Sequence, residues 1–204
     1  MLQYLLILLV ILGIQRENKL AENINNLNQE AYNVSDEDNP LDYNQMIHLA
    51  SKRWNQTPES LEDIMNRIAF HETAQQMDPS IKQYGGGPGR GLFQFELGEN
   101  QGGMTAMRRL RGMFKKGNIP EWTNYDPREG LDASTLNEEQ QKMLFLANVM
   151  GHPTASLKGV NPDNLSEFWQ NYHYAGTEDK RGLFNETMNA YDVKYKPTVD
   201  EIAY

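Results

Sequence analysis

Apolar residues along most of the chain recur at three- and four-residue intervals, which is the spacing of one face of an α-helix. The pattern is clearest in four segments, 57–73, 102–117, 135–151 and 161–176. In the first segment Thr57 can cap the helix and Pro58 takes the first helical position, ahead of an apolar stripe formed by Leu61, Ile64, Met65 and Ile68. The chain is therefore expected to be mostly α-helical, with a short β-element around residues 91–96.

The later helical segments carry their own start and stop signals. The third opens with the capping box Thr135-x-x-Glu138 and stops at Gly151. The fourth, residues 161–176, has on one face Leu165, Phe168, Trp169 and Tyr172. This stripe predicts that Tyr172 faces the interior of the domain.

Composition divides the chain into four parts. Residues 1–15 are almost entirely apolar, 16–43 form a polar linker, 44–195 form the helical domain and 196–204 form a tail. The first part is shorter than the roughly 20 apolar residues that span a bilayer, and it lacks the basic start and small-residue cleavage site of an ordinary signal peptide. Three interpretations stay open: a membrane-anchoring helix, an atypical export signal, or a helix that packs in an assembly.

Charge and cysteine content exclude several classes of protein. The net charge of −9 argues against general nucleic-acid binding, and the absence of cysteine excludes disulfides and thiol nucleophiles. One basic cluster stands out in this acidic chain: Arg108, Arg109, Arg111, Lys115 and Lys116. It is either the solvated face of an amphipathic helix or a surface for anionic polymers.

The glycine-rich stretch GGGPGRGLFQFE, residues 85–96, does not match a phosphate-binding loop. Gly86 and Gly91 have the P-loop spacing, but Leu92 and Phe93 stand where Lys and Ser or Thr are required. The dinucleotide-binding fingerprint also fails, because Arg90 occupies the place of its third glycine.

Glu72 is the candidate catalytic residue. It lies four residues after Ile68, so it continues the apolar stripe at the C-terminal end of its helix. Burial and the negative end of the helix dipole both favour the protonated form of a carboxyl group, which is the form that a general acid needs. The alternative is a side chain that turns to solvent at a frayed helix end. His71-Glu72 also begins an H-E-x-x-H-like pattern, but Gln75 stands at the second ligand position, and no metal or cofactor is expected.

Three short motifs follow one another in the order Glu72-Thr73, GLFQF at residues 91–95 and YHYAG at residues 172–176. In order and spacing they resemble the soluble lytic transglycosylases of the lysozyme-like superfamily, whose patterns are Glu-Ser, G-L-M-Q-I and A-Y-N-A-G. The resemblance covers about residues 46–184. It implies a mostly α, lysozyme-like α+β fold in which a small loop or β-element lines a glycan groove.

The resemblance also implies roles for individual residues. Glu72 would be the single catalytic acid and base, and Gln94 would line the groove beside the scissile bond. The substrate-binding residues would be Thr73, Phe93, Gln94, Tyr172, His173 and Tyr174. Alignment of the third motif puts His173 where the family has the Tyr that contacts the catalytic Glu, whereas the helical stripe favours Tyr172. The alternative for Phe93 and Phe95 is a role in the core alone.

The implied activity is cleavage of the β-1,4 bond between N-acetylmuramic acid and N-acetylglucosamine in peptidoglycan, giving a 1,6-anhydro product. No second carboxylate lies on a predicted apolar face, although Asp78, Glu96 and Glu99 are close in sequence. The alternative function is a catalytically inactive lysozyme-like structural, virion or wall-binding protein. Expected partners are glycan strands, a membrane through residues 1–15, and other virion proteins if the chain belongs to a phage particle. The expected location is a membrane anchor facing the periplasm, or a phage particle.

Overall fold

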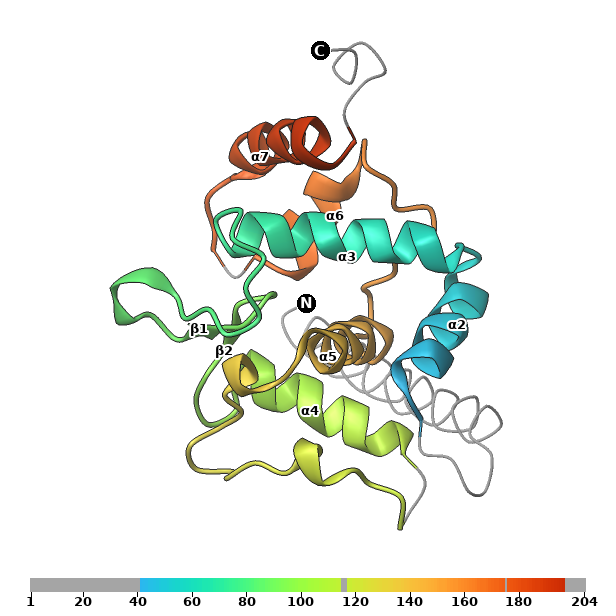
Figure 1. The fold of residues 1–204 in the computed structure, drawn as a ribbon, viewed down its shortest axis with the longest axis vertical. Helices are drawn as coiled ribbons and strands as arrows, with labels where there is room; N and C mark the ends of the chain where they lie inside the picture. Colours follow the sequence, from blue (N-terminus) through green and yellow to red (C-terminus); the bar gives the residue numbers. More distant parts are fainter. Residues whose placement is uncertain (1–40, 115–116, 175, 197–204) are drawn as a thin grey trace, which may run out of the picture.

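A computed structural model describes residues 41–114, 117–174 and 176–196. Within these ranges the protein is mostly helical, with six α-helices and one two-stranded sheet (Figure 1). No helix in these ranges is long and apolar enough to cross a membrane. The predictions for residues 1–15, for most of the linker and for most of the tail lie outside the described residues.

The bounds of the helices are α2 (Tyr43–Trp54), α3 (Pro58–Glu72), α4 (Gly102–Met113), α5 (Glu138–Met150), α6 (Leu165–Tyr172) and α7 (Arg181–Tyr195). Three 3₁₀ turns accompany them: η1 (Tyr84–Gly86), η2 (Glu121–Thr123) and η3 (Ala133–Thr135). Strands β1 (Gly89–Arg90) and β2 (Phe95–Glu96) pair antiparallel, with Gly89 opposite Glu96 and Arg90 opposite Phe95.

The helix α3 agrees with its sequence pattern. The hydroxyl of Thr57 accepts a hydrogen bond from the Ser60 amide at 3.2 Å, and Pro58 begins the helix. The predicted apolar stripe is buried along its full length: Leu61, Ile64, Met65 and Ile68. A capped start and a continuous buried face stabilise α3 and fix the position of its last residue, Glu72.

Four predicted helix boundaries are wrong: the starts of α5 and α6, the end of α4, and the end of α6, which lies at Tyr172 instead of Gly176. The capping box of α5 is formed by Asn137 and Gln140, whose side chains each bond the other's backbone amide, while Thr135 ends the preceding turn η3. Helix α6 begins four residues later than predicted, at Leu165, because Asn161 and Asn164 close a turn of their own. The Gly151 stop of α5 is confirmed.

Helix α4 ends at Met113 instead of continuing to residue 117, since Phe114 adopts an extended backbone conformation. Its arginines do not form a single solvated face. Arg108 is exposed and bonds the Asn100 side chain, Arg109 reaches Asn148, and Arg111 bonds the Thr123 carbonyl. Two of the three guanidinium groups therefore tie α4 to neighbouring segments.

Helices α2 and α7 did not stand out individually in the sequence. Helix α7 packs on α3 through Arg67, whose side chain is buried and bonds Asp63 at 2.9 Å and Asp192 at 2.5 Å. The ring of Tyr191 lies 4.7 Å from the same guanidinium group. A charge network and an aromatic ring thus hold α7 against the outer side of α3.

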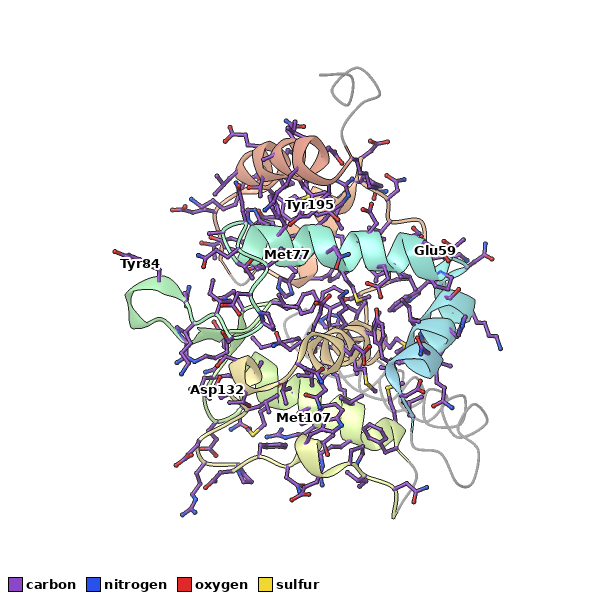
Figure 2. The ribbon with its side chains drawn as sticks, in the orientation of Figure 1. Glu59, Met77, Tyr84, Met107, Asp132 and Tyr195 are labelled. Carbon is purple, nitrogen blue, oxygen red and sulfur yellow. The ribbon has the colours of Figure 1, made fainter. Side chains whose placement is uncertain are left out.

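The arrangement of the helices places the end of α3 in the middle of the molecule. Figure 1 shows α3 between the α4–α5 pair and the α6–α7 pair, with the β1–β2 hairpin beside its C-terminal end. Glu59 marks the other end of the helix, and Tyr84 projects from the far end of the loop that leads to the hairpin (Figure 2). The C-terminal end of α3, the β1–β2 hairpin and the end of α6 therefore meet around Glu72.

Candidate active site

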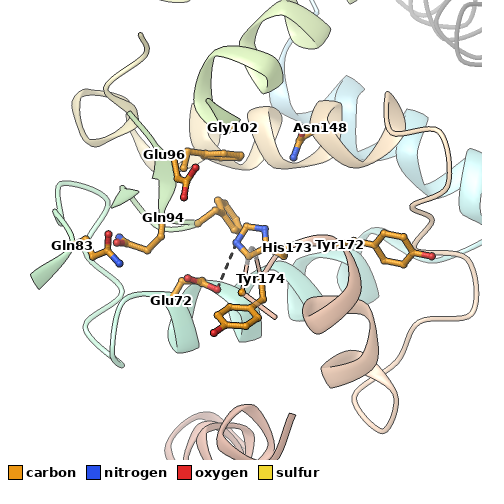
Figure 3. Close-up of a pocket in the computed structure, with 12 residues that line it drawn as sticks. Glu72, Gln83, Gln94, Glu96, Gly102, Asn148, Tyr172, His173 and Tyr174 are labelled. Carbon is orange, nitrogen blue, oxygen red and sulfur yellow. Dashed lines mark ion pairs between the residues drawn. The ribbon is translucent and has the colours of Figure 1, made fainter. Parts of the chain in front are cut away.

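Glu72 is the last residue of α3, and its carboxyl group lies between two side chains from the end of α6. The indole Nε1 of Trp169 donates a hydrogen bond to Glu72 Oε1 at 2.5 Å. His173 Nε2 lies 3.6 Å from the same oxygen (Figure 3). The Glu72 side chain is 17% exposed, so it is enclosed by protein yet open to a bound molecule.

A cleft of about 390 Å³ opens beside this carboxyl group. Its lining residues come from α3, the loop before η1, the hairpin, α4, α5 and the end of α6 with the residues after it: Glu72, Gln83, Phe93, Gln94, Phe95, Glu96, Gly102, Asn148, Tyr172, His173, Tyr174 and Gly176. Figure 3 shows Glu72 and Glu96 entering it from opposite sides, with Gln94 between them. The cleft joins all three motifs found in the sequence.

Gln94 is positioned by the tight turn between β1 and β2. Its backbone has a φ of 46°, and both its amide N–H and its side-chain Nε2 donate to the carbonyl of Gly91, the latter at 2.8 Å. One of the two N–H groups of Nε2 is used in this way, so its second N–H and the carbonyl oxygen of the Gln94 side chain are left to bond a substrate.

Gly91 is required for this turn for two reasons. Its φ of 72° is in the left-handed region that favours glycine, and a Cβ there would lie 2.2 Å from Gln141 Oε1. Gln141 is fully buried and bonds the Leu92 amide and the carbonyls of Pro79 and Leu136. The hairpin is thus held directly on α5.

Phe93 is a core residue as well as part of the cleft wall. It is 1% exposed, and its ring stacks on Phe145 of α5 with centroids 4.6 Å apart. Phe95 is similarly buried. The structure therefore gives both phenylalanines the packing role that was the alternative interpretation, with their cleft-facing edges available for apolar contact.

Thr73 lies outside the cleft. It is fully buried, and its hydroxyl donates to the Ala69 carbonyl at 2.7 Å while accepting a hydrogen bond from the Met77 amide at 2.9 Å. Both capacities of the hydroxyl are used to close the end of α3. Thr73 therefore supports the position of Glu72 and has no surface to offer a substrate.

In the third motif the residue beside Glu72 is His173, and the prediction that Tyr172 faces inward is wrong. Tyr172 is 40% exposed, and its ring contacts His152 and Phe168, away from Glu72. The helix ends at Tyr172, so the stripe no longer governs the next residues, and the chain turns His173 towards the carboxyl group. Tyr174 stacks on Trp169 with ring centroids 4.9 Å apart.

His71 does not line the cleft and packs against side chains of α6 and α7. Its ring packs against both Trp169 and Phe184, with centroid distances of 4.7 and 4.8 Å, and Nδ1 is 3.1 Å from the hydroxyl of Thr187 on α7. Burial lowers the pKa of His71, and the nearby Glu72 carboxylate opposes this shift. His71 is therefore a neutral packing residue at neutral pH.

Among the side chains at the site that were not assigned from the sequence are Trp169, which bonds Glu72, and the cleft residues Glu96 and Asn148. Trp169 was placed only in the apolar stripe, although a buried indole N–H needs an acceptor and Trp169 precedes His173 by one helical turn. Glu96 was set aside because no apolar face includes it, yet strand β2 carries it into the cleft. Asn148 had no local signal, since its place depends on the packing of α4 against α5.

Among the residues that the structure describes, no group of three or more His, Asp or Glu side chains gathers in a way that could hold a metal ion. Gln75, which occupies the second position of the zinc-like pattern, is exposed in the turn after α3.

Comparison of the chain with known protein-family models, with curated protein sequences and with solved structures gave no match.

Proposed function

We propose that the chain is a peptidoglycan lytic transglycosylase with a lysozyme-like domain, acting on the β-1,4 bond between N-acetylmuramic acid and N-acetylglucosamine. One observation carries the proposal: the partly buried carboxyl group of Glu72 stands in a cleft together with Gln94 and His173, one residue from each of the three motifs. A partly buried carboxyl group that opens onto a cleft of this size can reach a bound glycan and protonate a glycosidic oxygen.

In the proposed reaction the Glu72 carboxyl group donates its proton to the glycosidic oxygen as the bond to C1 of the muramic acid breaks. The resulting carboxylate then removes the proton of the C6 hydroxyl of the same sugar, whose oxygen bonds to C1. The product is a 1,6-anhydro end, and Glu72 is protonated again. Because the attacking hydroxyl belongs to the substrate, no second carboxylate and no ordered water are needed.

The position of Glu96 favours a second candidate, hydrolysis by water. Glycosidases that use two carboxyl groups hold them on opposite sides of the scissile bond, with one as acid and the other as base or nucleophile. Glu96 lines the cleft opposite Glu72 (Figure 3). In this candidate Glu96 would activate a water molecule, and the product would carry an ordinary reducing end.

Replacement of the catalytic carboxyl group tests both candidates. Glu72→Gln keeps a side-chain oxygen that can accept from Trp169, so the domain should stay folded, and it should lower wall cleavage by about 10²–10⁴-fold because the proton donor is lost. Clearing of purified cell walls measures the activity. Glu59→Gln, at the exposed start of the same helix, is the matched control and should retain wild-type activity.

A Glu72→Gln protein with full activity would contradict the proposal. A wild-type protein that binds walls without cleaving them would instead indicate the inactive wall-binding or virion role.

The mass of the products separates transglycosylation from hydrolysis. Anhydro muropeptides are lighter by one water, about 18 Da, than the products of hydrolysis. We expect the wild type and Glu96→Gln to give anhydro ends at rates within a few-fold of each other, as measured by mass spectrometry of the digest. Reducing muramic acid ends that disappear in Glu96→Gln would establish hydrolysis.

A further inference from the structure

Asn148 brings an amide group from α5 into the cleft, and its orientation is fixed by a residue outside the cleft. The guanidinium Nη1 of Arg109 on α4 lies 2.5 Å from Asn148 Oδ1 and 2.8 Å from the Asn148 backbone carbonyl. An arginine side chain carries only donors. The oxygen of the amide must therefore face Arg109, and the nitrogen must face the other way.

The Arg109 side chain has little freedom to release this contact. It is half-buried between α4 and α5, and it lies close to Gly151. A Cβ at Gly151 would come within 2.7 Å of Arg109 Cδ, so the absence of a side chain there makes room for the arginine. The two hydrogen bonds from one nitrogen fix both the backbone and the side chain of Asn148.

On the cleft side, the Asn148 nitrogen points from α5 towards His173 (Figure 3). It offers N–H donors to a space that also holds the acceptors Glu72 and Glu96 and the side-chain amide of Gln94, which keeps one N–H beside its bond to Gly91. A donor whose own oxygen is turned away best suits a partner that only accepts, such as a carbonyl oxygen. In a glycan of the proposed kind, such oxygens belong to the acetamido group, which every sugar of the strand carries, and to the lactyl group, which only the muramic acid carries.

We infer that Asn148 Nδ2 donates a hydrogen bond to the acetamido carbonyl of an N-acetylated sugar in the cleft, and that Arg109 is the positioning residue that holds Asn148 in this orientation. The inference rests on the proposed function, because it takes the substrate to be an N-acetylated glycan. It adds a specificity residue from α5 to the three motifs. The site distinguishes N-acetylated sugars from sugars with a hydroxyl at the same carbon.

The test is an NMR titration of the ¹⁵N-labelled full chain carrying Glu72→Gln, which prevents cleavage. The probes are the β-1,4-linked trisaccharide of N-acetylglucosamine and cellotriose, which is neutral, has the same linkage and lacks the acetamido groups. We expect the first probe to shift the side-chain resonances of Asn148 and cellotriose to leave them in place. The N-acetylated probe should also bind more tightly.

Variants separate the hydrogen bond from the packing around it. Asn148→Asp keeps an acceptor for Arg109 and removes the donor, and Asn148→Ala removes both. Each should weaken binding of the N-acetylated probe about three- to tenfold and leave cellotriose binding unchanged. Arg109→Met should have a similar effect, whereas Arg108→Met, at an exposed position of the same helix, should have none.

Two results would overturn the inference, and they differ in what else they overturn. If the N-acetylated probe shifts cleft resonances such as Gln94 but neither moves Asn148 nor depends on the variants, the inference fails and the proposed function stands. If neither sugar shifts any resonance of the cleft, the inference and the proposed function fail together.

Discussion

The carboxyl group of Glu72 contacts two residues that stand one helical turn apart, Trp169 and His173. Trp169 belongs to the apolar stripe of α6 and also supplies a donor, so one side chain joins the core to the reactive group. A hydrogen bond to a charged partner is stronger than a neutral one, and it restricts the rotation of the carboxyl group. Trp169 is thus expected to position Glu72.

Replacement of Trp169 by Phe tests this role. Phe keeps an aromatic ring against His71 and Tyr174 but removes the N–H that bonds Glu72. A reacting group that loses its fixed orientation loses rate rather than substrate affinity. We expect Trp169→Phe to lower kcat on the order of tenfold and to leave KM nearly unchanged.

Steady-state kinetics with soluble glycan fragments measures the effect on kcat and KM. Trp122→Phe is the matched control, because Trp122 packs against Phe114 at the end of α4 and does not line the cleft. An unchanged kcat in a folded Trp169→Phe protein would show that the indole serves packing alone.

At the scale of single residues, the sequence predicts what depends on local periodicity. The place of Glu72 follows from its spacing after Ile68, and the structure puts it at the cleft. Tyr172 was assigned wrongly because the same periodicity was extended to the last residue of α6, where the chain turns away. Asn148 could not be found from the sequence, because the residue that orients it, Arg109, is 39 positions away on another helix.

At the scale of elements, the turn η1 and the β1–β2 hairpin that follows it depend on glycine for their backbone conformations. Gly85 and Gly91 both have a positive φ, of 74° and 72°, but their surroundings differ. A Cβ at Gly85 would meet nothing within 4 Å, whereas a Cβ at Gly91 would meet the buried Gln141. Gly85 is therefore required only for its backbone conformation, whereas Gly91 is required both for its backbone conformation and for the space beside Gln141.

Alanine at each position measures the two effects. Gly85→Ala should lower the free energy of unfolding by about 1 kcal/mol, the cost of a left-handed conformation with a side chain. Gly91→Ala should cost at least about 2 kcal/mol more, because Gln141 must move from three hydrogen bonds. Gly91→Ala should also reduce activity, since Gln94 is held by the Gly91 carbonyl.

Urea denaturation of both variants gives the comparison. Equal losses of stability would mean that Gln141 adapts freely, and that the hairpin is not fixed on α5 as the hydrogen bonds indicate.

The helices themselves were easier to predict than their ends. The stripe of α3 and its Thr57 cap are confirmed, because both are set by neighbours within one or two turns. The start of α5 was placed at a capping box two residues too early, since Thr135 and Asn137 both suit a cap and tertiary packing decides between them. The hairpin was expected only as a short β-element, because strands of two residues carry little periodic signal.

At the scale of the whole molecule, the last turn of α3 lies where α6 and α7 join the rest of the domain (Figure 1). His71 fills this junction, in contact with Trp169 and Phe184 and beside Thr187. Because the His71 ring is enclosed by these side chains, its protonation changes the free energy of unfolding of the domain. The lowered pKa of His71 therefore has a consequence for the whole domain.

The sign of this effect follows from where His71 binds its proton. Burial lowers the pKa of folded His71 below the value of about 6.5 in the unfolded chain. Between these two values the unfolded chain binds more protons, so the free energy of unfolding falls as the pH decreases below about 6.5. Glu72 and His173 face the ring and act in opposite directions on its pKa, Glu72 raising it and His173 lowering it.

We expect the contribution of His71 to reduce the free energy of unfolding by up to about 1.4 kcal/mol for each pH unit below about 6.5, until the folded pKa is reached. His71→Gln keeps a partner for Thr187 and cannot gain a charge, so its stability should fall less steeply over the same interval. Urea denaturation at pH 7.5, 6.5, 5.5 and 5.0 measures the difference. His48→Gln, exposed on α2, should follow the wild type.

Parallel curves for the wild type and His71→Gln would mean that His71 accepts a proton without unfolding the junction, and that α6 and α7 are joined to α3 less tightly than the packing of its ring indicates.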